Sequence, residues 1–555
     1  MKKNPPLSRP VEWTLASLLL LCLAAQLAVA IRADGMTVDE MVYIGCGYRH
    51  LVHSDFRMNP EQPPVAKMWA ALPLLALHLE EPDPPIGDDQ IGWPDRFLHE
   101  VNRTRPILGY ARIAIACGTM LLAGVVWRWA RRLYGGEVGL GALAVCAFHP
   151  SLLAHGHLAT TDLLSALTFL LASWSFWHWS RMPRPPLALA VAASIGVAVT
   201  TRFTAWLLPL VFAALLLPWM RGRDRAAAAR HIALLAAIGA VVVPLVIWAV
   251  YGFHYAPWPG ESAARAVDPS LGIPGQIVAR LQEWRALPEA YLEGLRFQLE
   301  HNRQGHWGYL LGESGSAWRH YYLVACVVKN TPGFLLLTGL VLASLPRWRP
   351  RLIAGEAELH WLLPAVTVFA VASLARIQLG ERYVLAVYPY VILLVGSAAA
   401  TARTWRGGRF VLAAALVLHM VPAVLATRHG YLMYFNRLAG GPLGGHRVLA
   451  DSNLDWGQDL PRLARWMKER GVDRIQLGYF GSDDPDRYGI VHEDLPTWGA
   501  NRPQRPAAQP FHGTIAVSAN LVLGLFFPAD QDPYAFLRAR TPDDRVGAFF
   551  IYRLP

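Results

Sequence analysis

The sequence predicts a polytopic α-helical membrane protein with about eleven transmembrane helices, interfacial helices in the first outer loop and a small α/β domain at the C-terminus. Of 555 residues, 54% are hydrophobic and only 16% are charged, whereas soluble domains carry about 25% charge. Apolar blocks recur at lengths near the roughly 20 residues that cross a bilayer. Basic residues gather in alternate loops, and the last segment mixes a helix-like run with strand-like runs.

The apolar blocks define the expected spans. The first block is longer than the apolar core of a signal peptide, so we interpret it as an uncleaved span. The expected ranges are 13–31, 107–128, 136–152, 162–180, 187–201, 203–220, 232–251, 321–345, 359–375, 383–401 and 408–427.

The loop charges predict the topology. Basic clusters precede the first span and follow the second, fourth, sixth, eighth and tenth, which makes that side cytoplasmic and the number of spans odd. They comprise Lys2, Lys3 and Arg9; Arg128, Arg131 and Arg132; Arg181 and Arg184; Arg221, Arg223, Arg225 and Arg230; Arg347, Arg349 and Arg351; and Arg403, Arg406 and Arg409. Topology thus explains the net charge of +11 without nucleic acid as a partner. We expect a multi-pass protein of the inner (plasma) membrane with a cytoplasmic N-terminus.

The long segments then lie on the non-cytoplasmic side. They are 32–106, 252–320 and 428–555, of which the last is expected to be a periplasmic or extracellular domain distinct from the membrane module 1–427. The first outer loop is acidic, and the sequence contains no P-loop. An enzyme with this layout would need an activated substrate that is delivered in the membrane.

Several basic residues contradict the topology pattern. Arg202, Arg376 and Arg382 lie at outer span ends, and Lys329 is expected about two turns inside the eighth span. Arginine suits bidentate phosphate contact, and an ionisable group within a span is usually functional. The alternative is that these side chains reach the interface and bind nothing. Anion binding is the interpretation that covers them together.

Asp39 and Glu40 stand side by side immediately outside the first span. Neighbouring residues of a helix do not share a face, so only one carboxylate can enter a given site. A single carboxylate suits proton abstraction from a hydroxyl or amine. Asp162, at the start of the fourth span, either orders Asp39 or the acceptor, or is simply a helix N-terminal acid near Thr160 and Thr161.

The rest of the first outer loop predicts two helices on the membrane surface. "YIGCGYRHLVHSDF" carries apolar and aromatic residues at helical spacing, and "NPEQPPVAKMWAALPLLALHL" begins with prolines and continues with an apolar face. Lys67 lies on the second helix, at the level of lipid headgroups.

A metal site has weak support. His155, His157 and Asp162 lie close together in the sequence, but no further ligands accompany them, and polar histidines at an interface are the alternative. The five cysteines show no disulfide or metal spacing. No cofactor is required, although a divalent metal stays open.

The segment after residue 428 predicts a small α/β domain. "LPRLARWMKERG" reads as a helix, and "RIQLGYF", "TIAVSANLVLG" and "GAFFIYRL" read as strands. The stretch "DSNLDWGQDL" suits sugar or acceptor contacts through its polar and aromatic side chains, but it would equally brace the domain against the membrane part. The residues concerned are Asp451, Asn453, Asp455, Trp456 and Gln458.

Four stretches together resemble a known family. They are "TVDE…YIGCGYRHL…DFRMNPEQPPVAK", "LLAHGHLATTDLL", "GERYVLAVYPY" and "YFNRLAGGPLGGHRVLADSNLDWGQDL". In this order they resemble the GT-C glycosyltransferases, and more narrowly the protein O-mannosyltransferase and aminoarabinose transferase group of glycosyltransferase family 39 and its bacterial relatives. The resemblance covers about residues 13 to 490.

The resemblance implies a polyprenyl-phosphate sugar as donor, a non-cytoplasmic active site and transfer with inversion. It implies that Asp39 is the general base, that Lys67 lies near the donor phosphate, and that Asp162 and Arg382 match further acidic and basic positions. Asn59 and Glu61, in the matching "NPEQPPVAK", become candidates for sugar or acceptor contact.

Two departures limit the resemblance. Aminoarabinose transferases carry an acid linked to a metal site directly before the lysine, where this chain has Ala66. The loop 252–320 is too short for the inserted repeat domain of eukaryotic protein mannosyltransferases. The acceptor, whether protein, lipid or glycan, is therefore left open.

Three classes of function compete. A lipid-dependent glycosyltransferase explains the outer acids, the misplaced arginines and the interfacial helices. A lipid or lipid-sugar transporter or flippase would be expected to show inverted repeats and acids inside the membrane. A scaffold or sensor leaves Asp39, Lys67 and Lys329 without a role.

Overall fold

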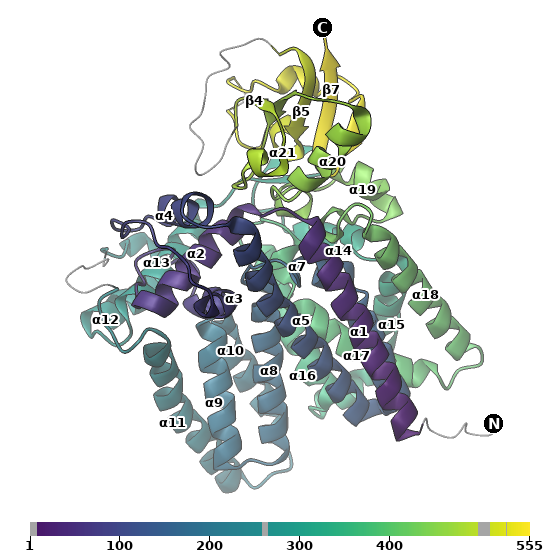
Figure 1. Cartoon of the computed structure of the whole chain (residues 1–555). Coiled ribbons are helices and arrows are strands. Elements are labelled where there is room, and N and C mark those ends of the chain that lie inside the picture. Colours follow the sequence, from purple (N-terminus) through teal and green to yellow (C-terminus); the bar gives the residue numbers. More distant parts are fainter. Residues whose placement is uncertain (1–7, 258–264, 498–510, 529) are drawn as a thin grey trace.

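The computed structural model describes residues 8–257, 265–497, 511–528 and 530–555. A bundle of helices carries a small sheet domain at one end, and the first helix, which begins at Arg9, starts at the other end (Figure 1). Lys2 and Lys3, residues 258–264 of the second outer loop and residues 498–510 of the C-terminal segment lie outside the described residues.

Helices occupy all the ranges expected to span the membrane. They are α1 (Arg9–Ala33), α5 (Thr104–Tyr134), α6 (Gly136–Ala147), α8 (Asp162–Arg181), α9 (Pro185–Val199), α10 (Leu207–Trp219), α11 (Arg225–Val250), α15 (Pro332–Ile353), α16 (Ala357–Leu374), α17 (Val387–Ala402) and α18 (Gly408–Ala426). Five of the described helices, α1, α5, α11, α16 and α18, are long and apolar enough to cross a membrane by themselves. The polytopic helical fold class is confirmed, whereas the count of eleven stays a prediction.

The eighth expected span is interrupted. Helix α14 (Tyr321–Lys329) ends at Lys329, and α15 begins at Pro332, where the side chain of Thr331 accepts a hydrogen bond from Phe334 N at 3.1 Å. Proline disfavours helical conformation in the residue before it and favours the first position of a new helix. Lys329 therefore lies at the end of a short helix, and its expected position two turns inside a continuous span is wrong.

The first outer loop forms α2 (Val38–His53), α3 (Pro64–Ala71) and the 3-10 turn η1 (Leu72–Ala76) at the end of the bundle near the sheet domain (Figure 1). Helix α3 and its continuation expose Trp69, Leu72 and Leu75, as expected of an interfacial helix. Helix α2 differs, because it is buried along most of its length. At Gly47 a side-chain Cβ would lie 2.2 Å from the carbonyl oxygen of Lys67, so glycine allows the two helices to touch.

Further short elements surround this end of the bundle. They are α4 (Gly92–Asp95), the π-helical turn η2 (Arg96–Glu100), α7 (Pro150–His155), η3 (Phe203–Trp206), η4 (Pro269–Leu271), α12 (Gly272–Glu283), α13 (Glu289–Gln304), the hairpin strands β1 (Gly308–Leu310) and β2 (Glu313–Gly315), and η5 (Glu381–Val384).

The connection from the bundle to the sheet consists of short turns. They are η6 (Tyr431–Met433), η7 (Arg437–Ala439), α19 (Gly441–Gly444), η8 (Gly445–Arg447) and η9 (Asp451–Asn453).

The C-terminal segment forms a five-stranded sheet in the order β4-β3-β5-β7-β6. Its elements are α20 (Leu460–Arg470), β3 (Ile475–Gly478), η10 (Pro485–Tyr488), β4 (His492–Asp494), β5 (Gly513–Ser518), α21 (Ala519–Val522), η11 (Ala535–Leu537), β6 (Asp544–Val546) and β7 (Phe549–Leu554). Strand β3 runs parallel to β4 and β5, and β7 runs antiparallel to β5 and β6. The expected helix and three strands are confirmed, and β4 and β6 are additional.

Both faces of the sheet are buried. Side chains of alternate residues point to opposite faces of a strand, so Ala516 and Ile551 pack in a small core with Leu463 of α20. Their neighbours Val517 and Phe550 belong to the main hydrophobic core of the chain. The sheet domain is thus joined to the helical part by apolar packing as well as by polar contacts.

Candidate active site

Helix α2 carries Asp39 and Glu40 in its first turn, and the two side chains contact different partners. Glu40 accepts hydrogen bonds from the backbone N–H and the hydroxyl of Thr37 at 2.9 and 3.0 Å, which closes a capping box at the helix start. Glu40 also pairs with Arg112 at 2.7 Å, where both side chains are fully buried, and accepts from Ala159 N at 2.7 Å. Glu40 therefore anchors α2 and the loop 156–161, and it is turned away from Asp39.

Asp39 faces a basic group. Its Oδ2 accepts hydrogen bonds from Arg382 Nη1 at 2.7 Å and from the hydroxyl of Tyr43 at 3.2 Å. The side chain of Asp39 is 23% exposed, whereas that of Asp162 is 3% exposed. Asp39 is therefore the more accessible of these two carboxylates.

Arg382 links the two expected acids. Its Nη1 lies 4.0 Å from Asp162 Oδ2 as well as close to Asp39. The opposite oxygen of Asp162 accepts from Arg202 Nη1 at 2.5 Å. The guanidinium of Arg382 lies 4.3 Å from the ring centroid of Trp456. Asp39, Arg382, Asp162 and Arg202 therefore form one line of alternating charges, which we call the charge network.

Tyr383 completes the network and was not predicted. Its ring lies under both arginines, 4.9 Å from the Arg202 guanidinium carbon and 5.6 Å from that of Arg382. An aromatic ring stabilises a partly desolvated cation above its face. The sequence signal was available, because Tyr383 directly follows an arginine that topology does not explain.

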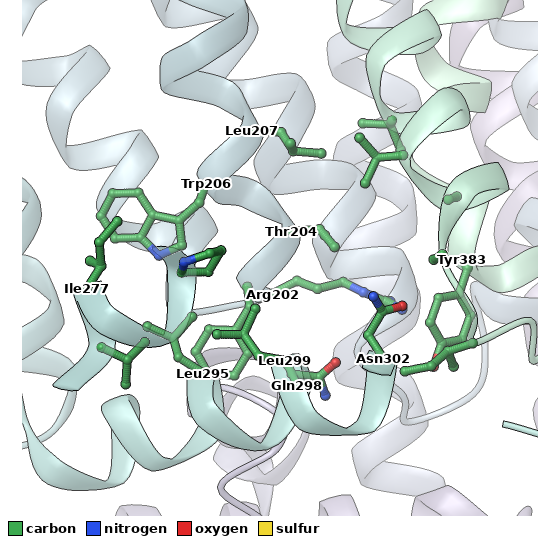
Figure 2. A pocket seen from close by; sticks show the side chains of 18 of the residues that line it. Arg202, Thr204, Trp206, Leu207, Ile277, Leu295, Gln298, Leu299, Asn302 and Tyr383 are labelled. Atoms are coloured by element: carbon green, nitrogen blue, oxygen red, sulfur yellow. The ribbon is translucent and has the colours of Figure 1, made fainter. Parts of the chain in front are cut away.

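A large apolar cavity adjoins the Arg202 end of the network. Its volume is about 940 Å³, and it lies among η3, α10, α12, α13 and α16. Arg202 and Tyr383 stand at its polar end, while Trp206, Ile277 and Leu299 contribute to its apolar walls. Figure 2 shows the side chain of Arg202 extending across the cavity towards Asn302 and Tyr383. The cavity can hold an apolar chain with an anionic end at the guanidinium.

Lys67 belongs to a separate cluster. Its ammonium group donates to Asn59 O at 2.7 Å and to Asn59 Oδ1 at 3.1 Å. Burial lowers the pKa of Lys67 to about 8, and burial raises the pKa of nearby Glu61 and Asp88. The structure thus brings the predicted Lys67, Asn59 and Glu61 together, but no contact among the described residues joins them to Arg382.

Lys329 is held by main-chain carbonyls. It donates to Leu432 O and Asn453 O, both at 2.7 Å. Its charge faces Glu381, a buried acid that also accepts a hydrogen bond from Ser151 at 2.7 Å. Lys329 therefore holds the segment before α20 in place. It does not contact Arg202 or Arg382. Glu381 was missed, although it stands directly before Arg382 in "GERYVL".

The stretch "DSNLDWGQDL" mostly braces the site. Main-chain hydrogen bonds join Val38 N to Trp456 O at 3.0 Å and Gly35 N to Gln458 O at 2.8 Å. Asp455 accepts from Asn520 N at 3.3 Å, and burial raises its pKa to about 8.

Asp451 and Trp456, two residues of the same stretch, both lie close to Arg382 of the charge network. Asp451 adopts a left-handed backbone conformation with φ 56° and lies near enough to Arg382 to interact with its charge. Trp456, through its contact with Arg382, is the member that meets the charge network directly.

The two candidate metal-binding histidines are differently placed. His157 is already engaged on both ring nitrogens, with Asp34 Oδ2 at 2.9 Å and with Leu153 O at 2.8 Å. His155 is buried, its Nδ1 has no hydrogen-bond partner, and its ring lies 6.2 Å from that of Trp456. Over the described ranges, no group of three or more His, Cys, Asp or Glu side chains is arranged to hold a metal.

Arg376, the remaining basic residue that topology does not explain, contacts helix α13. Its guanidinium donates to Arg303 O at 2.7 Å, and its backbone N–H donates to Asn302 Oδ1 at 3.0 Å. Arg376 therefore fixes α13 against the end of α16 and stands apart from Arg202 and Arg382.

Residues 108–248 match the model of the dolichyl-phosphate-mannose-protein mannosyltransferase family. The match covers about a quarter of the chain, and it agrees with the resemblance to the mannosyltransferase group of membrane glycosyltransferases. The matched segment includes Asp162 and Arg202 and ends before Arg382. No curated protein sequence matches the chain.

Solved structures of two kinds are similar to the chain. ArnT from Cupriavidus metallidurans in the apo state shares 16% identity with a TM-score of 0.48, covering 98% of this chain and 98% of that chain. The same protein bound to undecaprenyl phosphate gives 16% identity, a TM-score of 0.46 and coverages of 96% and 97%. The apo oligosaccharyltransferase of Archaeoglobus fulgidus gives 12% identity, a TM-score of 0.49 and coverages of 91% and 62%. Because each of these three TM-scores is below 0.5, the chemistry is argued from this chain's own residues.

Proposed function

We propose that this glycosyltransferase moves a sugar from a polyprenyl-phosphate donor to an acceptor on the non-cytoplasmic side of the membrane. The observation that carries the proposal is the apolar cavity of about 940 Å³ that ends at Arg202 and Tyr383. The polyprenyl chain would occupy the cavity, and its phosphate would meet Arg202. The description of the matching family, which names a dolichyl-phosphate sugar, supports a donor of this class.

Asp39 would act as the general base. Its exposed carboxylate would accept the proton of an acceptor hydroxyl or amine as that group attacks the anomeric carbon. The bond from the anomeric carbon to the phosphate oxygen would break on the opposite face, so the configuration would invert. The electron pair of the broken bond would remain on the polyprenyl phosphate, which leaves.

Arg202 and Arg382 would stabilise the departing phosphate. Guanidinium groups suit bidentate phosphate contact, and their charges are balanced by Asp162 and Asp39 in the described state. An arriving phosphate would compete with Asp39 for Arg382, which would release Asp39 to act on the acceptor. Lys67 stays a further candidate for the phosphate.

The orientation of the chain belongs to the same proposal. The charge network and the domain 428–555 would face the periplasm or exterior, and the N-terminus of the module 1–427 would face the cytoplasm. Protease protection of right-side-out and inverted membrane vesicles, read at tags on the two termini, tests this orientation. Equal cleavage of both tags from one side would contradict it.

The test of the activity compares wild-type protein with Asp39→Asn at equal abundance in membranes, using a panel of radiolabelled polyprenyl-phosphate sugars. Removal of a general base lowers the transfer rate by about 10²–10⁴-fold, while binding of unlabelled polyprenyl phosphate should persist. Glu80→Gln, an exposed acid of the same loop, serves as the control and should transfer normally.

The competing flippase function predicts a different result. A flippase would move labelled donor across the bilayer of proteoliposomes without transferring sugar, and Asp39→Asn would leave donor binding intact but change the flux. Equal transfer by wild type and Asp39→Asn would remove Asp39 as the base.

A further inference from the structure

Two adjoining cavities are separate from the 940 Å³ cavity, with which they share no lining residue. Their volumes are about 300 and 430 Å³, and both are lined by Arg105, Leu108 and Tyr488. The smaller one also includes Arg103, and the larger one includes Arg32 at the end of α1. We call the pair the basic crevice. It lies where the outer ends of α1 and α5 meet the sheet domain.

Three guanidinium groups of the crevice lack an acidic partner. Arg32, Arg103 and Arg105 are exposed, and in the part of the chain that the structure describes none of them forms an ion pair. The Arg105 guanidinium lies over the Tyr488 ring, 5.9 Å from the centroid. Unpaired arginines at a cavity are ready to bind an anion with charge-assisted hydrogen bonds.

The two carboxylates of the crevice do not neutralise these arginines. Asp34 is bound to Arg462 at 2.7 Å and to His157 at 2.9 Å. Asp483 accepts hydrogen bonds from Met36 N at 3.0 Å and from the Tyr488 hydroxyl at 2.6 Å. Both acids are therefore engaged by other partners, and the net charge of the crevice is positive.

Topology does not account for the arginines. Lysine and arginine accumulate in cytoplasmic loops, whereas Arg32, Arg103 and Arg105 lie at the end of the bundle that carries the sheet domain. Immediately along the same helices towards the bundle, Val29 is 51%, Tyr110 44% and Ile113 51% exposed. An apolar surface for acyl chains thus continues directly into a basic opening.

We propose that the basic crevice binds the headgroup of an anionic glycerophospholipid from the leaflet next to the sheet domain. The phosphate would lie among Arg32, Arg103 and Arg105, and the acyl chains would cover Val29 and Ile113. The bound lipid would connect α1 and α5 to the sheet domain through Tyr488. This site is separate from the donor cavity and does not depend on the glycosyl transfer.

The test measures binding of dioleoyl phosphatidylglycerol to the full chain in detergent by native mass spectrometry. The variant combines Arg32→Gln, Arg103→Gln and Arg105→Gln. The control combines Arg347→Gln, Arg349→Gln and Arg406→Gln, which removes the same charge from exposed positions at the opposite end. We expect the crevice variant to bind about tenfold more weakly or worse, the size of one lost charge-assisted hydrogen bond, and the control to bind like wild type.

Two comparisons identify the ligand. Phosphatidylcholine should bind wild type more weakly than phosphatidylglycerol, and increasing salt should reduce the difference, because exposed charges are screened. Equal binding of the two lipids, or equal loss in crevice and control variants, would overturn the proposal. Displacement of the lipid by inorganic phosphate at equal concentration would also overturn it and would assign a soluble anion instead.

Folding of the variants is checked separately. Unchanged thermal unfolding and gel filtration of the crevice variant would show that the binding loss is local. If the triple variant does not fold, Arg103→Gln and Arg105→Gln are compared singly with Arg103→Lys and Arg105→Lys. Weaker binding in the glutamine variants and retained binding in the lysine variants supports the proposal, and equal binding in all four overturns it.

Discussion

Arg462 of α20 lies 2.7 Å from Asp34, a residue 428 positions earlier in the chain that follows α1 directly. The exposed fractions of the two side chains are 12% and 2%. Asp34 also holds His157, which lies in the loop that leads to Asp162. The sheet domain is therefore connected, through the Arg462–Asp34 ion pair and the Asp34–His157 hydrogen bond, to the loop that precedes α8.

Replacing Arg462 should loosen this connection. Breaking a largely buried ion pair by removing one partner costs about 3–5 kcal/mol, so Arg462→Ala should lower the unfolding temperature strongly and increase cleavage between the bundle and the sheet. The control is Arg470→Ala on the same helix, whose pair with Asp544 is 57% and 33% exposed and is worth about 0–1 kcal/mol. Similar unfolding temperatures for the two variants would contradict the role of Arg462.

Substitutions of the neighbouring acids Asp39 and Glu40 should affect different properties, transfer in one case and stability in the other. Glu40→Gln breaks a fully buried pair with Arg112 and should reduce the amount of folded protein, again by about 3–5 kcal/mol of stability. Asp39→Asn should fold normally and lose transfer. Detergent gel filtration and thermal unfolding of both variants separate the two effects; a stable Glu40→Gln protein would show that Arg112 does not depend on this acid.

The pKa of Lys67, lowered by burial to about 8, makes donor binding dependent on pH if Lys67 holds the phosphate. The ammonium group loses its proton as pH rises through 8, so affinity for polyprenyl phosphate should fall there in wild type. Lys67→Met should bind weakly with no such step. A wild-type affinity that stays level between pH 7 and 9 would leave Lys67 as a support for Asn59 only.

The same pKa predicts the direction of a stability change. Between about pH 8 and 10.5 the folded chain binds fewer protons at Lys67 than the unfolded chain does, so this lysine contributes an increase in the free energy of unfolding as pH rises over that window. Unfolding temperatures of wild type and Lys67→Met should converge or cross as pH increases. A difference independent of pH would contradict the buried, partly neutral lysine.

Filling the apolar cavity should exclude the donor chain. Ala372 lines the cavity, and Ala372→Trp should weaken binding of long polyprenyl phosphates by about tenfold, roughly 1.4 kcal/mol. A short prenyl phosphate should be affected less because its chain reaches less far. Leu210→Trp, at a position of α10 that is 67% exposed, is the control, and equal losses in the two variants would place the chain elsewhere.

Topology was the strongest guide from sequence to site. Arg202 and Arg382 stood out because they lie at the wrong span ends, and the structure places both in one network with Asp39 and Asp162. Such anomalies are visible in sequence because charge near a membrane is constrained by the bilayer. The helix α20 and its three neighbouring strands were equally readable, since their apolar residues repeat with clear periods.

Other features needed the fold. The direction of the Glu40 side chain depends on Arg112, which is 72 positions away, although "TVDE" does carry the Thr-x-x-Glu signature of a capping box. Pro332 is a sequence signal for the helix break after Lys329. Hydropathy alone nevertheless predicts one continuous span where the structure has α14 and α15. The separation of Lys67 from Arg382 follows from how α3 packs on α2, which one sequence does not disclose.

The main-chain bond from Val38 to Trp456 has a consequence for how the protein is made. The helix that carries Asp39 leaves the ribosome early, but the segment that fixes its start is among the last to be synthesised. Until the segment around Trp456 has been synthesised, the start of α2 lacks this hydrogen-bond partner. A nascent chain arrested before residue 450 would therefore contain every expected span and still lack the segment that fixes the start of α2.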